Sequence, residues 1–535
     1  MANNLARPRS QRPARDAPQS QRLEEFFAPT SGFTNVPAIV APPSSIVSGE
    51  NVWVFAGRIE PRWRLEETAS NVFSDRPNGA FDYDAIDGTI FPIVTSAGTV
   101  AVLVGDAYST LGYVSGVSNL PPSGGQNDDF FGTSVYLTRS DINIAAITNG
   151  VDPVFVATPA DNTRLSTLTQ GPIAKDLALF DNRLVGWNIQ ELSSSSRFVN
   201  RAQWAAAGDP EDWTGIGSGF EDLIDMRGEG TRVIATEQDI LCFSTEEVWR
   251  GRRLGDATFV FRFTPLTKEA GAPFGRAVIQ TTEGIFWLGN DFNIWRFLGG
   301  QVSRIGTAIQ RTLRDTAKSL RTSFFSYNAE LNQLSFYYSV TVGSLPTRSF
   351  TLHLDSGAWT PHTFGFDVVR AFPLAISTSA TTWDGLVGAL SAQLQTYDEF
   401  LGLTGVPSVA LLTSDGTTAF FNDSATTDLG ATVVESVAFG PMFNTESRFS
   451  KLCNEVRLDV SAPSTSSLSI ALSDDLGATY NEEKKIAISA TSGGQHSALT
   501  FDTEGRTITM RLREDHGVRW QVSRIYANAD TEGRP

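Results

Sequence analysis

The chain has 535 residues, which is enough for more than one domain of ordinary size. Its net charge is −17 and only 19% of its residues are charged, which argues against a broad basic face for nucleic acid. Two cysteines, Cys242 and Cys453, are too few for a disulfide framework, and no apolar run reaches the roughly 18 residues of a membrane helix. We therefore expect no membrane-spanning segment.

Residues 1–48 differ in composition from the rest of the chain. Arginines outnumber acids over residues 1–22, which carry a net charge of +4 and leave −21 for the remainder. Pro and Ser are frequent, and apolar periodicity is absent until about Val52, so this segment alone cannot bury a core. We predict an extended or disordered N-terminal arm over residues 1–48, either free or lying on a neighbouring subunit.

From Val52 onward, short apolar runs alternate with Gly, Asn and Asp. The clearest are VWVF, TVAVLV, NIAAITNG, PVFVAT and LALFDNRLVGW, at residues 52–55, 99–104, 143–150, 153–158 and 177–187. Each run has the length and the β-branched or aromatic content of a strand, and turn residues separate the runs. The sequence therefore predicts a chain built from strands.

One internal repeat can be followed residue by residue. VIATEQDILCFSTEEVWR (233–250) aligns with VIQTTEGIFWLGNDFNIWR (278–296). The matched pairs lie 45 or 46 residues apart: Val233 with Val278, Ile240 with Ile285, and Trp249 with Trp295. Three strands and two tight turns at this period are typical of a propeller blade. We predict an all-β fold with a β-propeller of about six to eight blades over residues 49–428.

Two further elements complete the predicted fold. Residues 307–321 place Ile309, Leu313 and Leu320 on one helical face, which predicts one inserted amphipathic helix packed across the propeller. After about residue 429 the runs alternate cleanly between apolar and polar residues, as in VRLDVS, which predicts a C-terminal β-sandwich over residues 429–535.

The stretch SDDLGATY (473–480) resembles the Asp-box hairpin of sialidases. In this turn Asp475 can accept backbone hydrogen bonds, Gly477 can take a positive φ, and Tyr480 can anchor the returning strand. Ser473 begins the motif. A sialidase also needs an arginine cluster and a tyrosine nucleophile, which one box does not supply. We interpret the stretch as a structural turn motif.

The stretch FDYDAIDG (81–88) has some features of a calcium loop, through Asp82, Asp84 and Asp87. Its spacing departs from the alternating acidic ligands of such loops, so cation binding stays open. The chain has no HExxH, GxSxG or Walker motif. We expect no catalytic residue, no cofactor and no metal site, and hence no enzyme.

Three motifs stand in fixed order along the chain. The first is a turn in QWAAAGDPEDWTG (203–215), formed by Gly208, Asp209, Pro210, Asp212 and Trp213. An Ile-Trp-Arg strand end at 294–296 and the Ser-Asp-Asp-x-Gly turn at 473–477 follow it. This ordered set resembles the tail nozzle proteins of short-tailed bacteriophages, also called tail tubular protein B or packaged-DNA stabilisation protein. The resemblance is clearest over residues 176–306 and 440–527.

The resemblance implies a structural virion protein located in the tail and assembled in the host cytoplasm. Such proteins form a hexameric ring below the portal and its adaptor, around the channel through which the genome leaves. We expect a homo-oligomer that contacts adaptor or portal-side proteins and offers attachment for fibres or spikes. Double-stranded DNA should pass an acidic surface without sequence-specific binding. The alternative is a propeller-type tail protein that binds or cleaves glycans, as a depolymerase or sialidase does.

Overall fold

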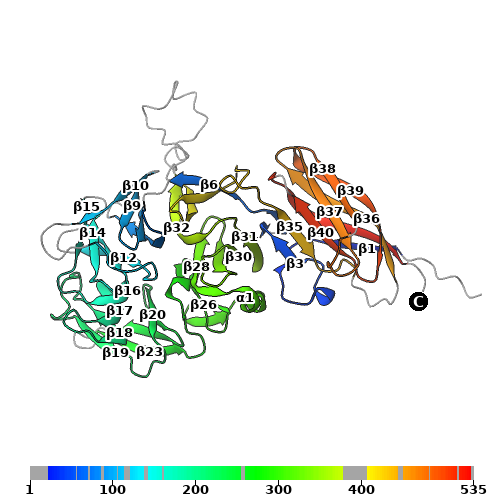
Figure 1. The fold of residues 1–535 in the computed structure, drawn as a ribbon. Coiled ribbons are helices and arrows are strands. Elements are labelled where there is room, and N and C mark those ends of the chain that lie inside the picture. Colours follow the sequence, from blue (N-terminus) through cyan, green and yellow to red (C-terminus); the bar gives the residue numbers. More distant parts are fainter. Residues whose placement is uncertain are drawn as a thin grey trace, which may run out of the picture.

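The computed structural model describes fourteen ranges of the chain: 22–55, 57–69, 73–85, 90–104, 107–113, 121–137, 142–158, 162–254, 260–376, 406–423, 425–443, 450–480, 482–514 and 517–531. Within these ranges the protein consists almost entirely of strands, and the predicted all-β fold is confirmed. The strands form two bodies, a ring of sheets and a module of two facing sheets (Figure 1).

Seven sheets follow one another around the ring in the described part of the chain. The first sheet consists of β7 (Pro77–Asp84), β8 (Ile90–Ser96), β9 (Val100–Val104) and β10 (Ala107–Thr110). The second consists of β11 (Gly112–Tyr113), β12 (Phe131–Leu137), β13 (Ile142–Thr148), β14 (Phe155–Thr158) and β15 (Asn162–Thr167). The third consists of β16 (Ile173–Phe180), β17 (Arg183–Gln190), β18 (Arg197–Trp204) and β19 (Gly219–Asp222). The fourth sheet consists of β20 (Gly230–Ala235), β21 (Ile240–Ser244), β22 (Val248–Arg253) and β23 (Phe261–Thr267). The fifth consists of β24 (Val278–Thr281), β25 (Gly284–Leu288), β26 (Ile294–Leu298) and β27 (Gln301–Arg304). The sixth consists of β28 (Ser319–Asn328), β29 (Gln333–Ser339), β30 (Arg348–His353) and β31 (Ala358–Thr363).

The seventh sheet closes the ring with strands from both ends of the propeller segment. It joins β32 (Val368–Ile376), β33 (Val406–Thr413) and β34 (Thr418–Asn422) to β6 (Arg64–Ala69), which pairs antiparallel with β34. An early strand thus completes the last sheet, so the ring has no open end.

Local sequence explains the tight antiparallel hairpin of β16 and β17. In LALFDNRLVGW, Asp181 and Asn182 adopt φ values of 51° and 57° between β16 and β17. Two successive residues with positive φ form a two-residue hairpin turn whose twist matches that of the strands on either side. Asp and Asn tolerate this conformation.

The predicted repeat corresponds to two neighbouring sheets. Its first copy covers β20 to β22 and its second covers β24 to β26. Strand pairing joins equivalent positions in the same way in both copies: Val233 with Cys242 and Cys242 with Trp249, then Val278 with Trp287 and Trp287 with Trp295. The 45-residue period is therefore the length of one sheet.

The two-sheet module draws strands from both ends of the chain. One sheet has the order β39 (Thr491–Gly505), β36 (Lys451–Ala462), β41 (Gln521–Thr531), β5 (Arg58–Pro61), β4 (Val52–Phe55), with β1 (Arg22–Phe27) also paired to β41. The other has the order β2 (Gly32–Phe33), β3 (Ser45–Glu50), β35 (Glu435–Phe439), β40 (Thr509–Glu514), β37 (Ser466–Ser473), β38 (Glu482–Ile488). One apolar core, which includes Phe27, Phe439 and Trp520, joins the sheets.

The predicted domain boundaries differ from the observed ones at the N-terminal side. Residues 22–48 were expected in an extended arm and residues 49–61 in the propeller, yet both segments supply strands to the two-sheet module. Phe27 and Ile46 are buried in its core. These strands are short, and β1, β3 and β5 pair with residues hundreds of positions away, so local composition does not reveal their place in the module. Residues 1–21 lie outside the described residues.

The inserted helix is shorter than predicted. Helix α1 spans Gln310–Thr316, and the chain turns to extended backbone at Ala317 before β28 begins. Ile309 and Leu313 are buried as expected, but Leu320 lies in β28. The β-branched and aromatic run that follows, TSFF, favours a strand, and strand pairing with β29 extends it backwards.

Two buried ion pairs hold the junction between the bodies. Arg62, between β5 and β6, pairs with Asp428, which also accepts a hydrogen bond from the Leu65 backbone N–H at 3.0 Å. Arg64 on β6 pairs with Glu435 on β35. Burial, with repulsion from Arg62, lowers the pKa of Arg64 to about 10. The junction thus holds together the two places where the chain crosses between the bodies.

Replacing Asp428 with Asn should destabilise the protein by about 3–5 kcal/mol, because Arg62 is then left as a buried charge without its partner. Urea unfolding followed by tryptophan fluorescence measures this change. The control is Asp315→Asn, which removes an exposed pair with Arg311 and should cost less than about 1 kcal/mol. Equal losses in the two variants would contradict the role of the junction.

Candidate functional site in the centre of the ring

A cavity of about 420 Å³ lies where the innermost strands of the seven sheets meet. Its walls come from β7, β12, β16, β20, β24, β28 and β32, together with the 3-10 helix η2 (Gly275–Ala277). The cavity is therefore enclosed by one inner strand from each of the seven sheets. Its size is that of a small-molecule pocket.

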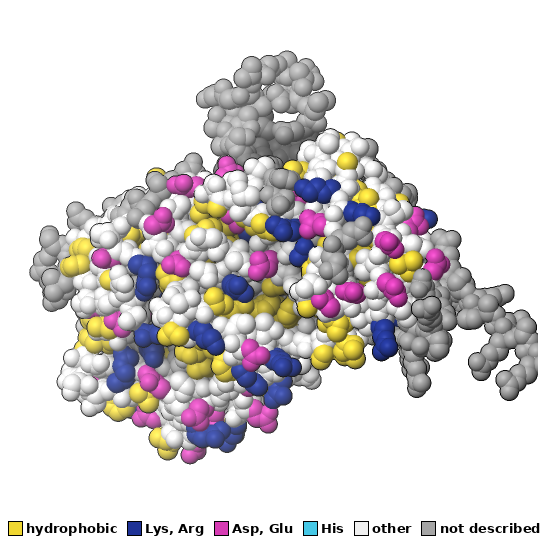
Figure 2. All heavy atoms as spheres, turned by 45° about the vertical axis from the view of Figure 1, so that its right-hand side comes forward, with side chains coloured by type: hydrophobic (Ala, Val, Ile, Leu, Met, Phe, Trp, Pro, Cys, Tyr) yellow, Lys and Arg dark blue, Asp and Glu magenta, His cyan; other side chains and the backbone are white. Residues whose placement is uncertain are grey.

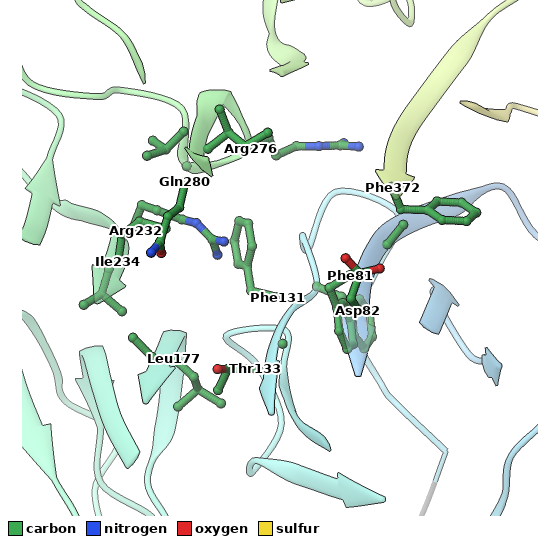
Figure 3. Close-up of a pocket in the computed structure, with 18 of the residues that line it drawn as sticks. Phe81, Asp82, Phe131, Thr133, Leu177, Arg232, Ile234, Arg276, Gln280 and Phe372 are labelled. Atoms are coloured by element: carbon green, nitrogen blue, oxygen red, sulfur yellow. The ribbon is translucent and has the colours of Figure 1, made fainter. Parts of the chain in front are cut away.

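One end of the cavity is basic. Three side chains, Arg232, Arg276 and Arg370, line it and are called here the arginine cluster. They come from β20, η2 and β32, so only ring closure brings them together. The ring of Phe131 lies 4.1 Å from the Arg232 guanidinium carbon and 5.7 Å from that of Arg370. Figure 3 shows Arg232 pointing toward Phe131.

Two members of the cluster have acidic partners. Arg232 donates to Asp176 at 2.6 Å, and Asp176 also accepts the Val233 backbone N–H at 2.6 Å. Arg276 lies 3.2 Å from Asp129 and donates to the Val369 carbonyl at 2.8 Å. These two pairs use both carboxylates that face the cluster, so its net charge is positive.

Arg370 differs from its neighbours. It is only 8% exposed, and among the described residues its side chain has no ion pair or hydrogen bond, while its guanidinium carbon lies 5.7 Å from the Phe131 ring. Its Nε is buried without a hydrogen-bond partner. Burial, with repulsion from Arg276, lowers the pKa of Arg370 well below its usual value.

The other end of the cavity carries Asp82 and Asp84 on β7. They are two positions apart in one strand and therefore share a face. Oδ1 of Asp82 is buried without a hydrogen-bond partner among the described residues. Burial, and to a lesser degree the Asp84 carboxylate, raises the pKa of Asp82 to about 7. In Figure 3, Asp82 lies across the cavity from Arg232.

The structure describes only part of the segment 81–88, for which cation binding stayed open. Asp87 lies outside the described residues, whereas Asp82 and Asp84 line the cavity. Among the residues that the structure describes, no group of three or more His, Cys, Asp and Glu side chains is placed to hold a metal ion.

A second hollow, of about 440 Å³, opens at the face where the inner strands begin. It shares Phe131 and Gly275 with the central cavity. Lys175, Arg197 and Arg321 line it, and Lys175 pairs with Glu229 at 3.0 Å. Asp128, Asp129 and Glu229 also line this hollow, so the charges along the approach to the arginine cluster are balanced.

The predicted turn motifs lie away from this cavity. Asp209, Pro210 and Trp213 form the connection from β18 to β19, where buried Trp213 donates to the Pro210 carbonyl at 2.7 Å and Asp209 accepts the Glu211 N–H at 3.2 Å. Gly208 has φ 70°. These bonds organise the loop and position the outer strand β19.

The second turn motif lies in the two-sheet module. Asp475 accepts from the Thr479 N–H at 2.8 Å and its hydroxyl at 2.6 Å, and Ser473 accepts from the Gly477 N–H at 2.8 Å. The Thr479 hydrogen bonds are the main reason that the pKa of Asp475 falls to about 2. Gly477 has φ 88°. Tyr480 is half-buried, with the Arg511 guanidinium 4.2 Å from its ring, rather than inserted in the core.

The arginine cluster was not identified from the sequence. Arg232 and Arg370 occupy comparable inward positions on two inner strands that are separated by more than a hundred residues. A basic residue in an otherwise apolar inner strand, as in VVRAF, is the signal that could have found it.

Comparisons with known proteins identify no family for this chain. No family model and no curated protein matches the chain. Among solved structures, BBS1N in complex with ARL6DN matches with a TM-score of 0.39 and 8% identity, covering 68% of this chain and 98% of that one. The extracellular domain of a hybrid two component system from B. thetaiotaomicron has a TM-score of 0.38 and 8% identity, with 82% and 47% covered.

An exo-beta-1,3-galactanase from Phanerochaete chrysosporium, solved with galactose, matches with a TM-score of 0.27 and 7% identity, covering 87% of this chain and all of that one. These low values say nothing about what this chain does. In the described ranges, no helix is both long and apolar enough to cross a membrane.

Asp82 predicts a pH dependence of stability. Its pKa is raised in the folded protein, so its protonated form stabilises the fold, and that stability is lost as the pH rises from about 4 toward 7. Asp82→Asn should therefore raise the melting temperature more at pH 8 than at pH 5. Calorimetry at both pH values checks this, with exposed Asp225→Asn as the control. A pH-independent difference would contradict it.

Proposed function

We propose that the protein is a structural component of a bacteriophage tail, a nozzle subunit that forms a ring of copies around the DNA exit channel. The observation that carries the proposal is a pair of exposed apolar patches at separate places on a unit whose two bodies share buried ion pairs. The ordered motifs that resemble the nozzle family support it, since each occupies a structural turn or strand end.

The first patch lies at the outer edge of the third sheet and is called here the β19 patch. It consists of Ile216, Phe220 and Ile224, of which Ile216 is 96% and Ile224 88% exposed. β19 is the last strand of its sheet, so among the described residues one side of its backbone has no strand partner. Phe220 lies in β19 and the two isoleucines flank this strand, and exposed apolar side chains beside a sheet edge suit contact with another chain.

The second patch, the η1 patch, consists of Val36, Ile39 and Val40. The 3-10 helix η1 (Ala38–Val40) lies between β2 and β3, beside the two-sheet module. Figure 1 places β19 at the far side of the ring from β3. Two different patches on one subunit suit a head-to-tail contact, which generates a closed ring when the rotation between copies closes.

The centre of a single propeller does not serve as the DNA channel in this proposal. Side chains from all seven inner strands leave a cavity of about 420 Å³ there. A DNA duplex, whose major groove alone is about 12 Å wide, does not fit into a space of that size. Double-stranded DNA would instead pass through the middle of the ring of copies. The net charge of −17 supports passage without adhesion.

The visible surface agrees with a weakly adhesive protein. Figure 2 shows acidic and basic side chains interspersed over one face, with hydrophobic side chains between them. The alternative, a glycan-cleaving tail protein, rests on the turn at Asp475, whose carboxylate is bound to Thr479 and Ser473. A hydrogen-bonded turn of this kind supports a structural role.

The test of the proposed function is the composition of the particle. Mass spectrometry of purified virions should detect this chain as a stoichiometric component, and imaging should show a ring below the portal. Absence of the chain from mature particles would overturn the proposal. Cleavage of a labelled host polysaccharide by the purified chain would favour the alternative.

The two patches give a more specific prediction. Ile224→Asp and Ile39→Asp should each lower incorporation of the chain into particles at least tenfold. In the head-to-tail arrangement the β19 patch of one copy meets the η1 patch of the next, so either substitution buries a charge in that contact. Quantitative mass spectrometry of complemented virions measures this. Val342→Asp, at an exposed position between β29 and β30 that belongs to neither patch, is the control. Normal incorporation of both patch variants would refute the head-to-tail arrangement.

A further inference from the structure

The least satisfied charge in the described part of the protein is Arg370 on β32. It is 8% exposed, lines the central cavity, and has neither an ion pair nor a hydrogen bond among the described residues. Its Nε is buried without a hydrogen-bond partner, and an N–H donor that loses water without gaining an acceptor costs free energy.

The surroundings of Arg370 increase the imbalance. Arg276 and Arg232 are close enough to repel it, and the two nearby carboxylates, Asp129 and Asp176, are already bound to those arginines. Three positive charges therefore face two negative ones at this end of the cavity. Nε of Arg232 and Nε of Arg276 are also buried without hydrogen-bond partners.

From this arrangement we infer that the arginine cluster binds a small oxyanion, a phosphate or a carboxylate group, in the central cavity. The anion would accept from the free donors of Arg370 and offset the one uncompensated positive charge. Planar guanidinium groups are suited to such oxygens because they donate two parallel hydrogen bonds. Phe131 supplies an apolar wall that fixes the guanidinium planes of Arg232 and Arg370.

The size and access of the cavity limit the ligand. About 420 Å³ accommodates a small organic phosphate or carboxylate, but not a nucleic acid duplex. The second hollow leads to the same Phe131 wall, and its three basic residues are balanced by Asp128, Asp129 and Glu229, so it gives access to the cluster without repelling an anion. The exposed Asp84 at the opposite end would repel it, so the ligand enters from the side of the arginine cluster.

This site is independent of the proposed tail function. It lies inside one propeller and uses no residue of the β19 patch or the η1 patch. Anion binding to the purified chain and incorporation into virions can therefore succeed or fail separately.

The experiment is isothermal titration calorimetry of the full chain with inorganic phosphate and, separately, with citrate, at fixed ionic strength set by chloride. Melting temperature is recorded in the same buffers. We expect saturable binding of at least one probe with a rise in melting temperature. The phosphate and citrate arms show which oxyanion chemistry the site prefers. The same small response to both probes as to chloride would overturn the inference.

Arg370→Met tests the residue itself. The variant should lose the probe-dependent rise, bind at least tenfold more weakly, and melt at a higher temperature than the natural chain without probe, since an unpaired buried charge is gone. Arg262→Met removes an exposed arginine from β23 and should keep full binding. Retained binding in Arg370→Met would overturn the inference.

Arg370→Lys covers the case in which the methionine variant does not fold. It keeps the charge but loses the planar fork, so it should bind at least threefold more weakly than the natural chain. Unchanged binding in this variant would show that the guanidinium is not the contact and would overturn the inference.

Discussion

The whole arrangement depends on the buried ion pairs at the junction. Arg62 with Asp428 and Arg64 with Glu435 lie where the chain enters the ring and where it leaves it. β6 can close the seventh sheet only if the segment before it is held, because its pairing partner β34 belongs to the other end of the ring segment. Coulomb attraction between buried charges supplies that hold, at the cost of their desolvation.

Ring closure in turn creates the central cavity. Each inner strand contributes one or a few side chains, and only the closed ring brings Arg232, Arg276 and Arg370 to one end and Asp82 to the other. A polar interior of this kind is expensive to bury, which is why two of the arginines are paired with carboxylates. No carboxylate among the described residues pairs with Arg370, so the fold itself does not offset the free-energy cost of burying this charge.

The outer surface and the interior therefore suggest separate roles. The β19 patch and the η1 patch are exposed apolar groups that a solitary subunit would leave in water, and they suit contact between copies. The cavity is enclosed within each copy and has the size of a small-ligand site. Neither role requires the turn motifs at Asp209 and Asp475, whose hydrogen bonds shape loops.

The sequence by itself determined the strand content, the 45-residue period and the conformation of the tight turns. These features depend on neighbouring residues, such as the Asp181–Asn182 turn and the repeated Trp249 and Trp295, so a linear pattern carries them. The length of α1 was wrong because pairing of β28 with β29 prevailed over helical periodicity at Leu320.

Only the tertiary structure decided the partners of the N-terminal strands and the composition of the central cavity. β1 pairs with β41 across some five hundred residues, and Arg232 meets Arg370 across more than a hundred. Contacts at such separation leave no local periodicity, because they follow from how the chain closes on itself. The arm at 22–48 therefore became part of a sheet, and the arginine cluster became visible, only in the folded molecule.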